Sequence, residues 1–177
     1  VSAEASGDPV NPEVTPVKLS ATCEFAAKEG KQPIKVSWHQ GGALPRSPKE
    51  HIDLSKIGHG ALFRGEKGSL VCDFGTRLVM PAGPRADLTY FHPRPADQLA
   101  KPIGDFAGEW VRACKGDLKT SCNFEYAGNM IEMMMLGLVA YRAGKKIAYD
   151  GGRMTTGDAQ ADAFLRRTYR EGWPLNG

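Results

Sequence analysis

The first third of the chain alternates apolar and polar residues with the period of two that is typical of β-strands. This pattern predicts strands over residues 1–6, 17–27 and 34–42. The third strand would present two different faces, with Ile34, Val36 and Trp38 on one and Lys35, Ser37 and His39 on the other. Only one of these faces can meet the helices, so the alternation predicts a sheet with one covered face.

The middle of the chain contains a predicted long loop, followed by further predicted strands. Residues 41–59 combine glycine, proline, serine and charged residues, which predicts a surface loop. Three short apolar runs follow at 61–64, 69–74 and 77–80, and the glycine-containing turns between them predict an antiparallel meander. Residues 81–102 are rich in proline and glycine and predict an irregular segment.

Helical spacing dominates the remaining chain. It predicts helices over residues 103–116 and 121–144, a short strand over 146–149 and a last helix over 158–173. In the long helix, one set of residues follows the spacing of a buried face: Met130, Met134, Gly137, Leu138 and Tyr141, widened by Ile131 and Met135. Gly144, followed by two lysines, is a helix stop signal.

The order of these elements predicts an α+β fold, with an open, mainly antiparallel sheet and helices packed on one face. A length of 177 residues suits one domain over residues 1–177. The strand at 69–74 carries apolar residues on both faces, so the uncovered sheet face is expected to be mixed. A mixed face suits a subunit interface, and we expect a symmetric homodimer through it.

Composition and cysteine usage argue against several classes of function. The formal net charge of +3 is too small and dispersed to indicate a nucleic-acid partner. The sequence contains no run of about 18 apolar residues that would span a membrane. The four cysteines lack a CxxC pair, so we expect free thiols, with Cys72 and Cys114 buried, rather than a disulfide or a metal site.

The motifs of common catalytic sites do not occur. The nearest approach to a dinucleotide fingerprint, at Gly58–Gly65, has Phe63 where a third glycine is required and precedes a predicted strand instead of a helix. There is no P-loop, HExxH or GxSxG motif. The residues alone therefore indicate no catalytic, cofactor-binding or metal-binding residue on this chain.

Four stretches in order resemble one family: GHGALFRGEKGSLVCDF (58–74), EWVRACKG (109–116), SCNFEYAGNMIEMMMLGLVAYRAGKKIAYD (121–150) and ADAFLRRTYREGW (161–173). They are similar to the C-terminal domain of bacterial-type Gfo/Idh/MocA oxidoreductases, relatives of glucose–fructose oxidoreductase and inositol dehydrogenase. The resemblance implies a fold like the C-terminal domain of glyceraldehyde-3-phosphate dehydrogenase. It also implies a sugar or polyol held against a Rossmann domain that binds NAD or NADP. That domain's glycine-rich loop and the family's catalytic Glu-Lys-Pro segment are absent here, so no catalytic residue is carried over.

The resemblance also suggests substrate-binding residues. The family's NF(D/E)YAG segment starts a helix that faces the interdomain cleft, which assigns Asn123 and Tyr126 to the substrate. The alternatives are that Asn123 only caps the helix and that Tyr126 ties it to the sheet. SWHQGG resembles the end of a strand in the family, which adds Trp38 and His39 to the candidate substrate-binding residues. The alternatives are that Trp38 is a core or interface residue and that His39 is an exposed histidine without a ligand.

Two functions from different classes follow as expectations. One is the substrate-binding and dimerisation domain of an NAD(P)-dependent sugar or polyol oxidoreductase, with half of an NAD-dependent glycoside hydrolase as its variant. The other is a stand-alone carbohydrate-binding or assembly module without redox chemistry. Because relatives in this subgroup are often exported, the resemblance favours the periplasm over the cytoplasm.

Overall fold

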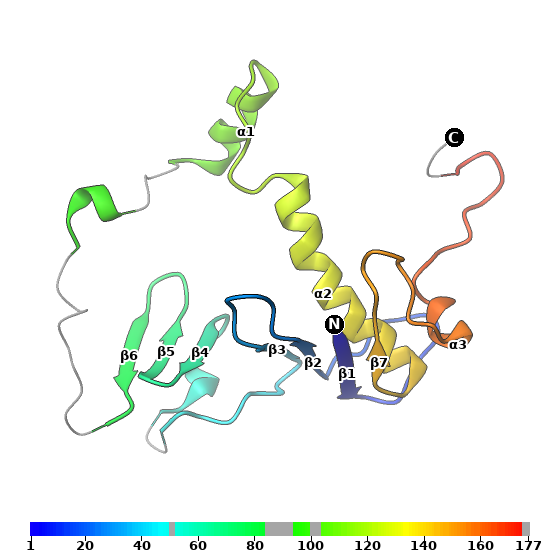
Figure 1. The fold of residues 1–177 in the computed structure, drawn as a ribbon, viewed down its shortest axis with the longest axis horizontal. Coiled ribbons are helices and arrows are strands. Elements are labelled where there is room, and N and C mark those ends of the chain that lie inside the picture. Colours follow the sequence, from blue (N-terminus) through cyan, green and yellow to red (C-terminus); the bar gives the residue numbers. More distant parts are fainter. Residues whose placement is uncertain (50–51, 84–93, 100–103, 175–177) are drawn as a thin grey trace. The chain divides into compact units, whose positions relative to one another are not determined.

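The structure is a computed structural model that describes residues 1–49, 52–83, 94–99 and 104–174. It is a mixed α+β fold with antiparallel sheets and few helices, which confirms the predicted class at this level (Figure 1). The chain separates into two compact units, Val1–Leu44 with Cys122–Gly177, and Pro45–Ser121. One domain over residues 1–177 stays a prediction.

The first unit is built on a four-stranded sheet. Its strands are β1 (Ser2–Gly7), β2 (Leu19–Phe25), β3 (Ile34–Gln40) and β7 (Ile147–Ala148), in the order β3-β2-β1-β7. All neighbouring strands are antiparallel. The strands predicted in the first third of the chain and the short strand near residue 147 are therefore confirmed, most of them with shorter bounds.

Helix α2 (Phe124–Ala143) covers one face of this sheet. The core between them consists of Ala3, Cys23, Leu136, Val139, Ala140, Ile147, Tyr149 and Ala161. The helix ends at Gly144, whose φ of 66° is a left-handed conformation that glycine adopts without steric cost. Near this end, Tyr141 Oη donates a hydrogen bond to the carbonyl oxygen of Asp8 at 2.6 Å, which fixes the loop after β1.

The predicted buried side of α2 is confirmed only in part: Gly137 and Tyr141 are buried, whereas Met130, Ile131 and Met135 are exposed. The buried residues are Leu136, Gly137, Val139, Ala140 and Tyr141. Met130 and Met135, expected on the buried face, are 48% and 47% exposed. Nearly every side of this helix is apolar, so the helical spacing could not select one face. The burial is instead confined to the carboxyl-terminal half of α2.

The last helix is much shorter than predicted. Helix α3 (Ala159–Asp162) has four residues, and the prediction of a helix that continues to residue 173 is wrong. Ala161 and Leu165 reach the core, but the residues from Arg166 to Pro174 are exposed. Short helices are marginal in water. Without apolar burial after Leu165, nothing offsets the conformational entropy that a longer helix would lose.

The uncovered face of the four-stranded sheet is polar. Its cross-strand rows are Ser2–Glu24–Lys35, Glu4–Thr22–Ser37 and Ser6–Ser20–His39. A mixed face was expected, but the strand that motivated this expectation, at 69–74, belongs to another sheet. A homodimer through the polar face stays a prediction, without the apolar centre on which it was based.

The second unit contains the predicted meander as a separate sheet. Its strands are β4 (Ala61–Gly65), β5 (Gly68–Cys72) and β6 (Arg77–Pro81), antiparallel and in this order. One face packs on Leu54, which lies in a short 3₁₀ helix, η1 (Leu54–Lys56), within the predicted loop. One sheet was predicted, because the alternation of apolar and polar residues identifies strands but does not determine which strands share a sheet.

The same unit contains η3 (Ala96–Gln98) and helix α1 (Phe106–Cys114). Asp105 caps α1 by accepting hydrogen bonds from two backbone N–H groups of the first turn. Glu109 is buried in α1, and its carboxylate accepts hydrogen bonds from Ser121 N at 3.0 Å and Ser121 Oγ at 2.9 Å. The helix predicted over 103–116 is confirmed, whereas the irregular segment predicted at 81–102 lies largely outside the described residues.

Candidate functional site

The segment Asn123–Gly128 forms the start of α2. Asn123 has the extended backbone of an N-cap residue, and its Oδ1 accepts a hydrogen bond from Tyr126 N at 3.1 Å. Glu125 adds a negative charge to the first turn, where the helix dipole favours it. The capping role of Asn123 is therefore confirmed. Its contact with a substrate stays a prediction.

Aromatic side chains are exposed at this end of α2. Phe124 is 93% exposed and Tyr126 is 60% exposed, whereas Val139 in the other half is 6% exposed. Tyr126 therefore does not tie the helix to the sheet. Along its length, α2 changes from an exposed half that carries Phe124 and Tyr126 to a buried half that carries Leu136, Val139 and Tyr141.

Gly137 marks the place where α2 meets the sheet. A Cβ added to Gly137 would lie 2.6 Å from the Cβ of Ala21 on β2. Tyr126 precedes Gly137 by eleven positions. With 3.6 residues per turn, this spacing places both on the same side of the helix, about 16 Å apart along its axis. Tyr126 thus lies on the sheet-facing side of α2, beyond the part that packs on the sheet.

Trp38 lies on the face of the sheet that α2 covers. It pairs across the strands with Ala21 and is 43% exposed. Its Nε1 donates a hydrogen bond to Gln40 Oε1 at 2.9 Å. Because its N–H already has an acceptor, Trp38 offers a partly exposed aromatic ring to its surroundings.

His39 lies on the opposite, polar face. Its Nδ1 is 3.0 Å from Ser20 Oγ on the neighbouring strand. Burial lowers the pKa of His39, so the ring is neutral near pH 7. The four predicted site residues are therefore not brought together: Asn123 and Tyr126 begin α2, and Trp38 and His39 lie on opposite faces of the sheet.

A charged cluster on the polar face was missed by the sequence analysis. Glu24 lies 2.7 Å from Lys146 Nζ and 2.9 Å from Lys35 Nζ. The hydrogen bonds from Lys146 and then Lys35 lower the pKa of Glu24 to about 2. Lys146 is 122 positions from Glu24, so no local pattern could have revealed this cluster.

A second polar group surrounds the turn after β7. The hydrogen bond that Tyr149 Oη donates to Glu132 Oε1, at 2.7 Å, together with burial raises the pKa of Tyr149 to about 12. The carboxylate of Asp162 accepts hydrogen bonds from the hydroxyls of Thr155 and Thr156. Tyr149 and both threonines line a shallow hollow of about 360 Å³. Their polar atoms already have protein partners, so this group stabilises the turn and does not single out a ligand.

Within the parts of the chain that the structure describes, no group of three or more His, Cys, Asp or Glu side chains could hold a metal ion. The four cysteines are free: Cys23 is buried, Cys72 half-buried, and Cys114 and Cys122 exposed. The expectation that Cys114 is buried is wrong, because α1 leaves that side chain uncovered, and Cys72, also expected to be buried, is only half-buried. None of the described helices is long and apolar enough to cross a membrane.

The chain was compared with protein-family models, curated proteins and solved structures, and none of them matches it. The resemblance to Gfo/Idh/MocA oxidoreductases therefore stays a prediction based on the four sequence stretches. Three of these stretches coincide with structural elements: β4 with β5, the end of α1, and α2 with β7. The third contains the exposed end of α2, which is the best-defined candidate site.

Proposed function

We propose that this chain is the substrate-binding and subunit-contact domain of an NAD(P)-dependent oxidoreductase that acts on a sugar or polyol. The change in burial along α2 carries the proposal. Its buried half anchors the helix on the sheet, and its capped, exposed half holds Tyr126 clear of the core. This exposed half is also the segment whose sequence resembles the cleft-facing helix of the family.

The chemistry of Tyr126 suits a polyhydroxyl ligand. An aromatic ring covers the apolar C–H face of a sugar, and the phenol both donates and accepts hydrogen bonds. Asn123 holds the backbone N–H of Tyr126 and therefore has a positioning role. Phe124 lies about 200° around the helix from Tyr126, so it belongs to another side and suits contact with a neighbouring domain.

The nicotinamide cofactor would be bound by a Rossmann domain outside these 177 residues. Pyrophosphate binding uses a glycine-rich turn that leads from a strand into a helix N-terminus. In this chain the segment before α2 reads Lys-Thr-Ser-Cys-Asn and has no such glycines. The contribution of this chain is therefore to bind and orient the substrate, not to transfer the hydride.

The reading frame that encodes the chain gives a first test. A glycine-rich dinucleotide motif followed by a Glu-Lys-Pro segment upstream of Val1 would support the proposal. A stop codon or an unrelated domain in that position would contradict it and favour a stand-alone binding module.

The complete gene product gives a second test. We expect it to reduce NAD⁺ or NADP⁺ in the presence of at least one member of a panel of hexoses, inositols and linear polyols. Hydrolysis of a glycoside without net reduction of the cofactor would point instead to the glycosidase variant. Absence of both activities across the panel would contradict the proposal.

A further inference from the structure

Helix α2 runs antiparallel to β2 and directly along it. The two elements meet at three places: Cys23 with Met133, Ala21 with Gly137, and Leu19 with Tyr141. Residue numbers fall along β2 as they rise along α2. The eight helical positions and the four strand positions between the outer contacts both span about 12–14 Å, so the helix follows the strand closely.

The same alignment carries Tyr126 over the hairpin that joins β2 to β3, residues 26–33. Tyr126 precedes Met133 by seven positions, which is about 10 Å of helix or about three residues of strand beyond Cys23. This distance places Tyr126 level with Ala26 and Ala27. Because Tyr126 lies on the sheet-facing side of α2, it borders the space between the exposed half of the helix and the hairpin.

The cations of this hairpin lie on the other side of the sheet. Phe25 pairs with Ile34, and an isolated bridge joins Lys28 to Lys31 in the same register. Successive side chains of a strand point to opposite faces. Lys28 and Lys31 are therefore on the polar face with Lys35, away from α2.

The side of the hairpin that faces α2 carries Ala27 and Gln32, which oppose each other in this register. Both side chains are uncharged. Gln32 is exposed, and its side chain makes no hydrogen bond with another described residue. Its amide is available to a ligand as both a donor and an acceptor.

Asn129 adds a second amide from the helix. It lies three positions after Tyr126 and about 60° around the axis, so the two are neighbours on the surface of α2. Asn129 is exposed, and its side chain makes no hydrogen bond within the described parts of the chain. One phenol and two amides thus border the space, and each can both donate to and accept from a hydroxyl group.

The charges nearest to Asn129 on α2 are negative. Glu125 and Glu132 lie four positions before it and three after it, the spacings of neighbours on a helix surface. Tyr149 Oη holds the Glu132 carboxylate in place with a hydrogen bond of 2.7 Å. A carboxylate or phosphate on a ligand would meet like charges here, whereas a hydroxyl group would not.

We propose that the substrate beside Tyr126 is an uncharged sugar or polyol that the amides of Asn129 and Gln32 help to bind, and that sugar acids and sugar phosphates are disfavoured. This inference rests on the proposed function, because it requires Tyr126 to contact the substrate. It adds the charge class of the ligand and two further binding residues.

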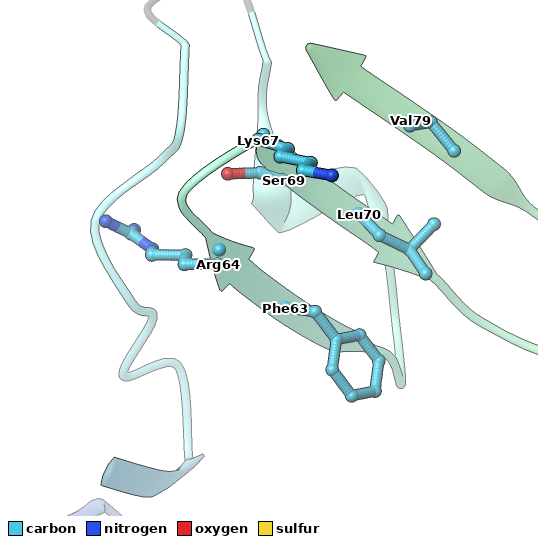
Figure 2. Close-up of a pocket in the computed structure, with 8 residues that line it drawn as sticks. Phe63, Arg64, Lys67, Ser69, Leu70 and Val79 are labelled. Carbon is cyan, nitrogen blue, oxygen red and sulfur yellow. The ribbon is translucent and has the colours of Figure 1, made fainter. Parts of the chain in front are cut away.

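The hollow on the three-stranded sheet has the opposite character. Phe63, Leu70 and Val79 line it from three neighbouring strands, as Figure 2 shows. The charged residues that line this hollow of about 290 Å³ are Arg64 and Lys67, which are both cations. An anionic ligand would therefore favour this hollow over the space beside Tyr126, and Lys67→Ala tests that alternative.

Kinetics of the complete gene product on matched substrate pairs test the charge class. The pairs are glucose with glucuronate, sorbitol with gluconate, and myo-inositol with its 1-phosphate. We expect kcat/KM to be about tenfold or more higher for the uncharged member. An equal or higher value for the anionic member would overturn this inference and leave the proposed function standing. Absence of activity on every pair and on the wider panel would contradict the proposed function itself.

Variants of Asn129 test its place in the site. Asn129→Leu removes the amide at similar size and should raise the KM for the uncharged substrate about two- to tenfold, with the KM for the cofactor unchanged. Asn129→Lys adds a cation and should reduce the discrimination against the anionic member severalfold. Leucine and lysine are better helix formers than asparagine, so neither change should unfold α2.

Gln32→Leu should also raise the KM for the uncharged substrate, whereas Gln160→Leu, at an exposed amide of α3, should not. Lys67→Ala should leave both members of each pair unaffected. Unchanged KM values in Asn129→Leu and Gln32→Leu, or unchanged discrimination in Asn129→Lys, would overturn the inference. Loss of activity on the anionic member alone in Lys67→Ala would place that ligand in the other hollow and would also overturn it.

Discussion

Gly137 of α2 lies so close to Ala21 of β2 that a Cβ on residue 137 would be 2.6 Å from the Cβ of Ala21. Carbon atoms in favourable contact are about 3.5–4.0 Å apart. The missing side chain of Gly137 therefore lets the helix approach the sheet. The contact fixes the point from which the first half of α2 extends beyond the sheet.

Gly137→Ala should therefore destabilise the chain, by about 1–3 kcal/mol, because the added methyl group forces the helix away from β2. Gly128→Ala is the matched control. It lies in the same helix, and a Cβ there would meet nothing within 4 Å. Its better helix propensity should stabilise the helix by up to about 1 kcal/mol. Urea denaturation followed by circular dichroism measures both, and equal effects of the two variants would show that the close contact is unimportant.

Asn123→Ala should loosen the exposed end of α2. Loss of an N-cap side chain costs about 1 kcal/mol. Because the first half of this helix is exposed, the effect should be local, with amide exchange at Tyr126 about fivefold faster. Asn123→Asp retains an oxygen acceptor and should keep exchange near the original rate. Unchanged exchange in Asn123→Ala, measured by NMR, would rule out a functional cap.

Glu24 should contribute to acid sensitivity. The pKa of its carboxyl is about 2 in the folded chain, below its ordinary value of 4.5. The unfolded chain therefore binds more protons between pH 4.5 and 2. The stabilisation from Glu24 is present above about pH 4.5 and is lost as the pH falls toward 2.

Glu24→Gln should accordingly flatten the dependence of stability on pH in this window. Glu13→Gln provides a control, since Glu13 is exposed and has no ion pair with a described residue. Urea midpoints measured from pH 2 to 6 compare the variants. A Glu24→Gln profile parallel to that of the original chain would contradict the role of Lys35 and Lys146.

NAD(H) and NADP(H) should show no measurable binding to this chain by calorimetry. The reason is the missing glycine-rich turn before a helix N-terminus, which dinucleotide sites use to hold the pyrophosphate. Micromolar binding of either cofactor would contradict the assignment of this chain to the substrate side of the enzyme.

Local sequence signals predicted much of the fold. The alternation in β3, the turn glycines around β5 and the stop at Gly144 all depend on neighbouring residues, and each corresponds to an observed element. The face of α2 and the division into two sheets depend on contacts between distant segments. Because α2 is apolar on nearly every side, periodicity could not identify its buried face. Periodicity also could not show that the strands form two separate sheets.

The contacts of the candidate site residues can likewise be separated into local contacts, which the sequence predicts, and contacts between distant segments, which it does not. The capping role of Asn123 is local, because its acceptor and the N–H of Tyr126 lie in one helical turn. Trp38 and His39 are adjacent in sequence but fall on opposite faces of β3, as alternation requires. One of the two ion pairs of Glu24 joins β2 to Lys146, just beyond the end of α2, and only the tertiary fold brings those two residues together.

Tyr126 is proposed to contact a sugar or polyol substrate, and the kinetics of the complete gene product test this contact most directly. With the most active member of the substrate panel, Tyr126→Ala should lower kcat/KM by about fivefold to about 150-fold, because ring contact and a hydrogen bond together contribute about 1–3 kcal/mol. The KM for the cofactor should stay the same. Tyr169→Ala removes another exposed tyrosine, 47% accessible, and should have no effect. Equal kcat/KM values for Tyr126→Ala, Tyr169→Ala and the unmodified protein would contradict the claim.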